Sequence, residues 1–210
     1  MDEVSAQTNS QGQYSLNYTS TDVGRLVTMG GTDTFTGKAI VAPMAAASGS
    51  GVISPLTTLT GVGGAAYLGK LAKVFAIDSL LVAANVTDLG RFDPIAAMQS
   101  GTNALVAAGT AVFSAQQAIM TVMQMANGMG AMGYGNVAAK INAAIDGLYA
   151  NLGTATPSML GSVNSIVDTV TQQVATEQIK ASIAALPNGT PDAVKTALLG
   201  QIPVVSGLVA

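Results

Sequence analysis

The chain of 210 residues contains no cysteine, no histidine and no tryptophan. Without cysteine it forms neither disulfides nor thiolate metal sites. Without histidine it lacks the commonest general base and the commonest metal ligand of proteins. Catalysis would have to rest on carboxylates, lysine, serine or tyrosine, and no serine–lysine or serine–carboxylate set stands out in so serine-rich a sequence. We therefore expect no catalytic residue, no enzymatic activity and no bound cofactor.

Charge is scarce as well. Aspartate, glutamate, lysine and arginine make up 9% of the sequence, and the formal net charge is −3. The basic residues are scattered singly, so no basic patch is available to neutralise phosphates, and we expect no nucleic-acid partner. Apolar residues make up 49%, which is too many for a disordered chain. The acidic N-terminus is followed by no apolar segment, so no cleavable signal peptide is expected.

Helix starts are marked by a repeated pattern in which a capping side chain stands directly before a proline. The pattern occurs at Ser54-Pro55, Asp93-Pro94, Thr156-Pro157 and Thr190-Pro191. The capping oxygen accepts from an otherwise unpaired amide, and proline in the first turn needs no donor. A further helix is predicted over residues 63–76, after a glycine cluster. Helices with clean apolar stripes are predicted from Val137 to Leu152 and over residues 157–186.

The longest uncharged run covers residues 94–139 and is long enough for a transmembrane helix. Amides and hydroxyls recur along it every seven residues, at Asn103, Thr110, Gln117 and Gln124. Apolar side chains, among them Val112 and Ile119, form the opposite stripe. This spacing predicts an amphipathic helix with an uncharged polar face and argues against a membrane span. Four glycines within residues 127–135 are predicted to end the helix.

The first part of the chain has the features of short strands. Tyr14, Leu16 and Tyr18 alternate with polar residues, and we predict strands at residues 13–17, 26–29 and 38–42. Small residues at positions 45–51 are interpreted as a linker. The predicted fold class is α+β and mostly α, with a short β-strand region over residues 1–45 and a helical domain of five or six helices over residues 46–210. The predicted core includes Leu56, Leu59, Leu71, Phe75, Phe92, Val112, Phe113, Ile141, Ile145, Val163, Val170 and Ile183.

Two patterns resemble binding motifs. Residues 64–70, Gly-Ala-Ala-Tyr-Leu-Gly-Lys, match the first seven positions of a phosphate-binding loop, but the eighth is Leu71 where Ser or Thr should ligate magnesium. The same residues have the apolar spacing of an ordinary helix, which is the favoured interpretation. Asp78, Asp88 and Asp93 could supply oxygen ligands to calcium. Their spacing is not that of an EF-hand, and Asp93 is also explained as a helix cap.

Three separated motifs carry a resemblance to a known family. They are Gly-Gly-Thr-Asp at residues 30–33, Ser-Pro-Leu-Thr-Thr-Leu at residues 54–59 and Phe-Asp-Pro-Ile-Ala at residues 92–96. In this order they resemble a module of very large secreted bacterial surface proteins, the RTX-type or cadherin-like adhesins. The resemblance covers roughly the first half of the chain. It implies an Ig-like strand remnant leading into helices, a non-enzymatic adhesive role, and a location outside the cell or at its surface. The chain has neither the tandem array nor the calcium-binding nonapeptide tail of such proteins.

We expect the protein to work as an assembly with copies of itself or with neighbouring structural proteins. The strand-like N-terminus, the Met-rich residues 128–134 and the apolar tail over residues 202–210 would each expose an unpaired edge or an apolar surface in a monomer. The predicted function is a structural or adhesive surface protein that forms a filament, layer or adhesin part. A virion structural protein, such as a capsid decoration, tail or fibre component, is the alternative. A small-molecule binding module would need convergent polar groups that the sequence does not reveal.

Overall fold

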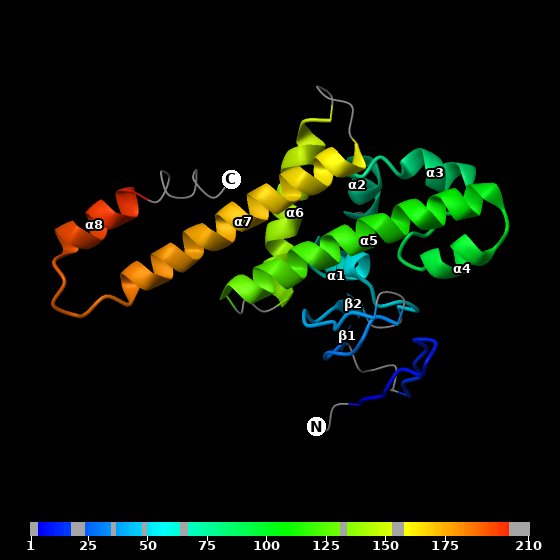
Figure 1. Ribbon diagram of the computed structural model, residues 1–210, viewed down its shortest axis with the longest axis horizontal. Coiled ribbons are helices and arrows are strands. Elements are labelled where there is room, and N and C mark those ends of the chain that lie inside the picture. The colour runs from blue at the N-terminus through cyan, green and yellow to red at the C-terminus, as the bar shows by residue number, and fades with distance from the viewer. Residues whose placement is uncertain are drawn as a thin grey trace.

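The computed structural model describes residues 4–17, 24–34, 37–47, 50–63, 67–130, 134–152 and 158–201. The predicted fold class is confirmed, because the described residues form mainly helices and one small antiparallel sheet (Figure 1). There are eight helices in this part of the chain, where five or six were expected. The elements are β1 Arg25–Val27, β2 Ala45–Ala47, α1 Pro55–Gly63, α2 Tyr67–Val74, α3 Asp78–Ala83, α4 Pro94–Gln99, α5 Asn103–Gly130, α6 Tyr134–Ala150, α7 Met159–Ala184 and α8 Asp192–Gly200.

The helical body is organised around two long helices, α5 and α7, which run side by side in the same direction (Figure 1). Helix α6 crosses them, and α1 and α2 pack against α6, while α3 and α4 cover the first part of α5. One apolar core joins these helices. Of the predicted core residues, Phe92, Phe113 and Val163 are only half-buried. The others are buried: Leu56, Leu59, Leu71, Phe75, Val112, Ile141, Ile145, Val170 and Ile183.

Helix α5 is amphipathic, as its spacing predicted. Val112 and Ile119 are buried, whereas Asn103, Thr110 and Thr121 are exposed. The hydroxyls on its polar face donate to backbone carbonyls one turn earlier, as Thr110 does to Val106 O at 2.8 Å. By length and composition alone, α5 is the one described helix that could cross a membrane. The predicted break within residues 127–135 is confirmed, since α5 ends at Gly130 and α6 begins at Tyr134. Residues 131–133 lie outside the described part of the chain.

The predicted helix starts are confirmed at two of the four capping pairs. Helix α1 begins at Pro55, and Asp93 caps α4 with its side chain. The pair Thr156-Pro157 lies outside the described residues, and α7 is capped instead by Ser158, whose side chain accepts from Gly161 N–H. Helix α8 has Pro191 itself at the N-cap position, one residue later than predicted, with no side-chain cap.

The β part differs from the prediction in three places. Residues 13–17 form no strand, and Asn9 instead makes a tight turn by accepting the N–H groups of Gln11 and Gln13 at its side chain. Residues 38–42 contribute only one isolated bridge, between Ala39 and Thr32. The second strand is Ala45–Ala47, which had been interpreted as a linker. It pairs with β1, so only the strand predicted at residues 26–29 is found near its expected place.

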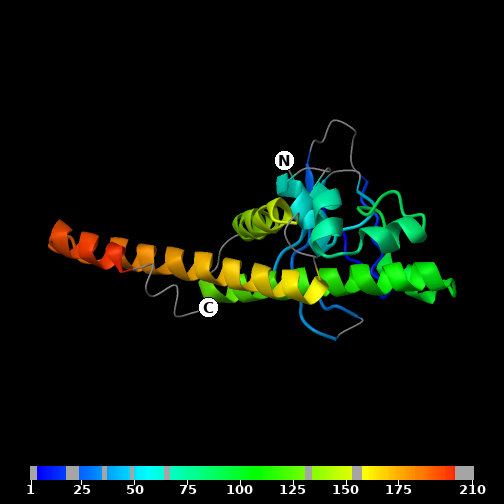
Figure 2. The ribbon, with the colours of Figure 1, turned by 90° about the horizontal axis from the view of Figure 1, so that it is seen from above.

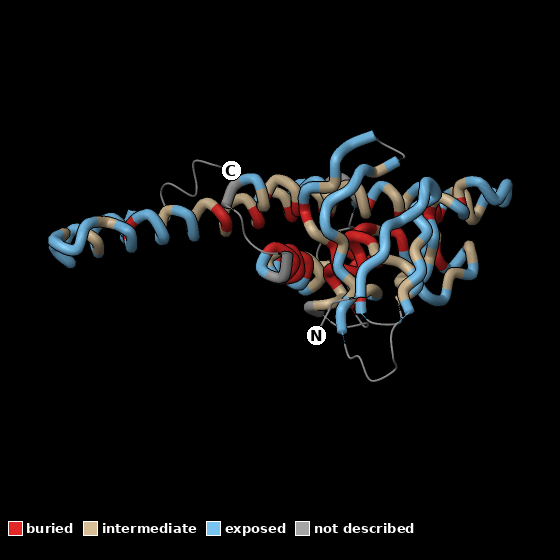
Figure 3. Tube along the Cα trace, turned by 90° about the horizontal axis from the view of Figure 1, so that it is seen from below, coloured by how far each residue is buried: buried red, intermediate tan, exposed pale blue. Residues whose placement is uncertain are grey.

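Beyond the body, the distal half of α7 and the whole of α8 extend outward as an arm, defined here as residues 175–201 (Figures 1 and 2). Figure 3 shows this arm as largely exposed. The predicted apolar stripe of α7 is buried along the body, at Ile166, Val170 and Val174, but α8 contains no buried residue. The arm is therefore held to the body mainly through the continuous helix α7, with one ion pair from Glu177 to Lys140 of α6 at its base.

Candidate functional site

The three calcium candidates have separate local roles. Asp93 Oδ1 accepts from the N–H of Ile95 at 2.9 Å and of Ala96 at 3.1 Å, which caps α4. Asp88 Oδ1 accepts from Gly90 N–H at 2.9 Å, and Asp78 lies in the first turn of α3. Within the described ranges, no three acidic side chains gather in a metal-binding group. Calcium binding at these residues stays a prediction, and the structure assigns Asp88 and Asp93 to turn and cap.

The segment that resembles a phosphate-binding loop is helical from Tyr67 onward, and residues 64–66 lie outside the described chain. Its lysine faces α6. Lys70 Nζ lies 2.7 Å from Asp146 Oδ1, and it sits 5.4 Å and 5.7 Å from the ring centres of Tyr67 and Tyr149. Both charged side chains are partly exposed, so the ion pair orients α2 on α6 and adds only about 0–1 kcal/mol.

Beside this ion pair lies a buried polar contact that no sequence pattern indicates. The Tyr67 hydroxyl donates to the carbonyl of Asn142 at 2.6 Å, and the Asn142 side chain donates to Leu59 O at 3.0 Å. Burial, and secondarily the nearby Asp146 carboxylate, raise the pKa of Tyr67 well above its usual range. These contacts tie α1, α2 and α6 together.

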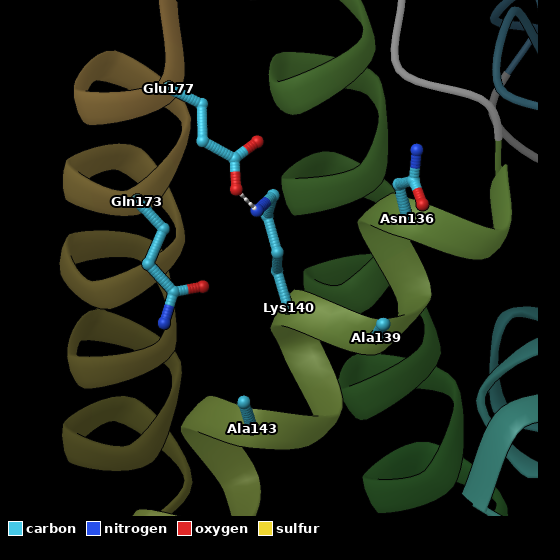
Figure 4. Close-up of a pocket in the computed structure, with 6 residues that line it drawn as sticks. All are labelled: Asn136, Ala139, Lys140, Ala143, Gln173 and Glu177. Carbon is cyan, nitrogen blue, oxygen red and sulfur yellow. Dashed lines mark hydrogen bonds and ion pairs between the residues drawn. The ribbon is translucent and has the colours of Figure 1, made fainter. Parts of the chain in front are cut away.

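A shallow groove of 390 Å³ runs between α6 and α7 (Figure 4). Ala139 and Ala143 line it together with polar side chains, and Lys140 forms an ion pair with Glu177 across it. Figure 4 shows Lys140 and Glu177 reaching toward each other between the two helices. The lysine and glutamate satisfy each other, so the groove serves as a contact between α6 and α7 in this structure.

The outer edge of β2 is closed by α1. Ala45 N–H donates to Thr58 Oγ1 at 2.9 Å, and the hydroxyls of Thr57 and Thr58 donate back to Ala45 O at 3.3 and 3.2 Å. Both threonines are buried. A strand edge with free N–H and C=O groups recruits another strand, and covering it with a helix prevents this. The residues between Ser54 and Leu59 therefore do more than start a helix, because they also hold the β part against the body.

Two apolar areas remain on the described surface, and we name them by their residues. The ribbon stripe consists of Val27, Met29 and Val41, which are 40%, 88% and 59% exposed. The arm face consists of Val194, Leu198 and Leu199, each more than 40% exposed. Of the interfaces expected from the sequence, the tail over residues 202–210 lies outside the described residues, and the Met-rich segment is described only at its two ends.

No protein-family model matches the chain, and no curated protein and no solved structure is similar to it. The resemblance to bacterial adhesin modules therefore stays a prediction based on the three sequence motifs.

Proposed function

We propose that this protein is a structural, non-enzymatic component of an extracellular or cell-surface assembly, which it forms with copies of itself. The observation that carries the proposal is the presence of two separate exposed apolar areas, the ribbon stripe and the arm face. They lie on different parts of the molecule, one in β1 and the segments that follow it and precede β2, and one on α8. Grouped apolar side chains on a surface are typical of an interface, whereas single ones are common everywhere.

The use of the charged side chains supports a structural role. Lys70 pairs with Asp146, Lys140 pairs with Glu177, and Arg25 donates to Gly61 O at 2.9 Å. Each of these contacts joins two elements that are distant in the sequence. Five charged side chains thus connect separate elements of the fold, and the amides and hydroxyls of α5 supply its polar face.

The shape of the molecule also supports assembly. An arm that projects from the body and has no buried residue in its last helix stabilises a monomer little. It is well placed to reach a neighbouring copy, whose apolar surface would cover the arm face. Burial of that face would stabilise the assembly through the hydrophobic effect and offset the entropy lost when the arm is ordered.

Sedimentation velocity at rising micromolar concentration tests the proposal. We expect species heavier than the 20.9 kDa chain, in proportions that grow with concentration. Leu198→Lys should shift the distribution toward the monomer, because it places a charge on the arm face. Val82→Lys is the matched control, since Val82 is 79% exposed and belongs to neither apolar area.

A wild-type protein that sediments at 20.9 kDa at every concentration would show that the chain does not assemble. Equal effects of the two lysine substitutions would show that the arm face has no special role.

A further inference from the structure

We infer that the free edge of β1 pairs with β1 of a second copy, around a two-fold axis at Val27, to form one antiparallel four-stranded sheet. This inference rests on the proposed function, because it identifies one interface of the assembly. The partner is a second copy of this chain, and the contact is made by backbone hydrogen bonds together with the ribbon stripe.

The two edges of the sheet are not equivalent. Val27 is paired with Ala45, and Thr28 N–H donates to Met44 O at 2.8 Å. Because successive residues of a strand direct their N–H and C=O groups to opposite sides, Val27 and Ala45 both direct theirs away from the ladder. Those of Ala45 are taken up by Thr57 and Thr58. Those of Val27 have no partner among the described residues.

The side chains that protect strand edges in other proteins, a free charge or a proline, are missing at β1 within the described chain. A charged side chain or a proline usually guards such an edge. The one charged side chain of β1, Arg25, is engaged with the carbonyl of Gly61 at the end of α1. Val27 and Met29 stand two residues apart on the same face and are exposed. The edge thus offers both unpaired backbone groups and apolar side chains.

Among axes through a residue whose N–H and C=O groups face outward, the flanking residues favour Val27. An axis through Arg25 would bring two arginines opposite each other, and like charges directly opposite are unfavourable. An axis through Met29 would extend the pairing into Gly30 and Gly31, whose φ values of 74° and 119° take the backbone out of the strand conformation. An axis through Val27 avoids both problems. It places Val27 opposite Val27 of the second copy and Met29 opposite the second copy's Arg25.

The pairing closes on itself. It is isologous, so each copy uses the same surface, and the outer edge of each β2 is already covered by α1. The sheet therefore stops at four strands, in the order β2-β1-β1-β2. A two-stranded ribbon is only marginally stable alone, whereas a sheet of four strands is more stable. Any larger assembly would have to grow through another surface, such as the arm face.

Cysteine cross-linking tests the register directly, because the chain has no cysteine of its own. Residues opposite each other in a hydrogen-bonded pair have Cα atoms about 5.5 Å apart, within the range of a disulfide. Under mild oxidation we expect most of the Val27→Cys protein to form a covalent dimer. Met29→Cys is the matched control, since its two copies would lie about 13 Å apart. A mixture of Arg25→Cys and Met29→Cys proteins should cross-link, although neither does so alone.

Backbone and charge substitutions provide independent tests by sedimentation. Val27→Pro removes an N–H that points away from β2, so we expect the fold to be retained and dimerisation to be lost. Val27→Thr should retain both the fold and dimerisation. Met29→Glu faces the second copy's Arg25 and should tighten the dimer, and Met29→Lys should weaken it. We expect the dimer dissociation constants of the Met29→Glu and Met29→Lys proteins to differ by about tenfold, because the two-fold axis makes the contact between residue 29 and Arg25 occur twice in each dimer.

The outcomes separate this inference from the proposed function. If the wild-type chain assembles but Val27→Cys and Met29→Cys cross-link equally, or if Val27→Pro assembles unchanged, the β1 pairing is wrong and the proposed function stands. If the wild-type chain is a monomer at every concentration, both are wrong. Circular dichroism of each variant confirms that the helical body remains folded.

Discussion

At the scale of single residues, hydroxyls and amides perform tasks that charges perform in most proteins. Thr57 and Thr58 close a strand edge, and Ser162 donates to Val74 O to connect α7 with α2. Gln117 reaches Asp33 of the β ribbon from the polar face of α5. Neutral hydrogen bonds depend on close geometry and are little affected by salt, so these contacts hold a weakly charged chain in one arrangement.

The buried hydroxyl of Tyr67 gives the first residue-scale prediction. Near neutral pH, Tyr67→Phe should lower the free energy of unfolding by about 1 kcal/mol, because it removes the hydrogen bond to Asn142 O. The folded-state pKa of Tyr67 is raised, whereas an unfolded tyrosine titrates near pH 10. Above that pH the unfolded chain loses the proton first, so the stability of the wild type falls as pH rises.

The difference between wild type and Tyr67→Phe should therefore shrink as the pH is raised above about 10. Urea unfolding over a series of alkaline pH values measures this difference directly. A difference that stays constant across the series would show that the burial of the hydroxyl does not control its ionisation.

At the scale of elements, α4 lies in close contact with the first part of α5. A Cβ built on Gly109 would lie 2.7 Å from the carbonyl oxygen of Pro94 and 3.0 Å from Ala97 Cβ. The glycine is thus required by packing, since its backbone φ is in the ordinary helical range. It lets the short helix α4 lie directly on α5, which fixes the loop between them.

Gly109→Ala should therefore destabilise the protein by about 1–3 kcal/mol, because the backbone of Pro94 must move to make room. Gly147→Ala is the matched control in α6. Nothing lies within 4 Å of the added Cβ there, so the better helix propensity of alanine should stabilise the protein by up to about 1 kcal/mol. Thermal unfolding of both variants measures the contrast. Similar effects of the two substitutions would contradict the close contact between α4 and α5.

The elements that could be predicted from the sequence are those whose signals are local. Pro55 and the Asp93 cap mark helix starts through their own backbone chemistry, and the heptad of polar residues on α5 follows from helix geometry. Strand β2 could not be predicted, because Ala45–Ala47 has a low strand propensity and is held by hydroxyls of α1. Gly128 and Gly130 lie in the last turn of α5, although glycine disfavours helices.

The sequence indicated the type of the candidate interface, an unpaired strand edge, but not its position. The sequence indicated an unpaired strand edge in the strand-like N-terminus, but the first predicted strand, at residues 13–17, is not formed. The free edge lies at β1 instead. Its location depends on which side of the sheet α1 covers, and that is a long-range contact between Ala45 and Thr58 without a local signal.

At the scale of the whole molecule, stability is distributed unevenly between body and arm. The body joins six helices around one apolar core, whereas α8 packs mainly on the end of α7. Helix α8 has nine residues and none of them is buried. Isolated helices shorter than about 12–15 residues are marginal in water, so α8 is stabilised in the single chain mainly by its contact with the end of α7.

Amide hydrogen exchange measured by mass spectrometry should reveal this distribution. At low protein concentration we expect the amides of α5 and α6 to exchange slowest and those of α8 to exchange fastest among the described helices, because local opening of α8 exposes almost no apolar surface. Ile183→Ala should accelerate exchange in α8 and leave α5 unchanged, since Ile183 is the buried residue nearest to the arm's end.

If the arm face lies in an interface, its protection must also depend on mass action. Raising the protein concentration should slow exchange in α8 of the wild type, because association favours the state in which the arm face is covered. The Leu198→Lys protein should lose this dependence while its α5 amides exchange as in the wild type. Slow exchange in α8 at low concentration, equal to that in α5, would mean that the arm is stable by itself and that assembly is not needed to hold it.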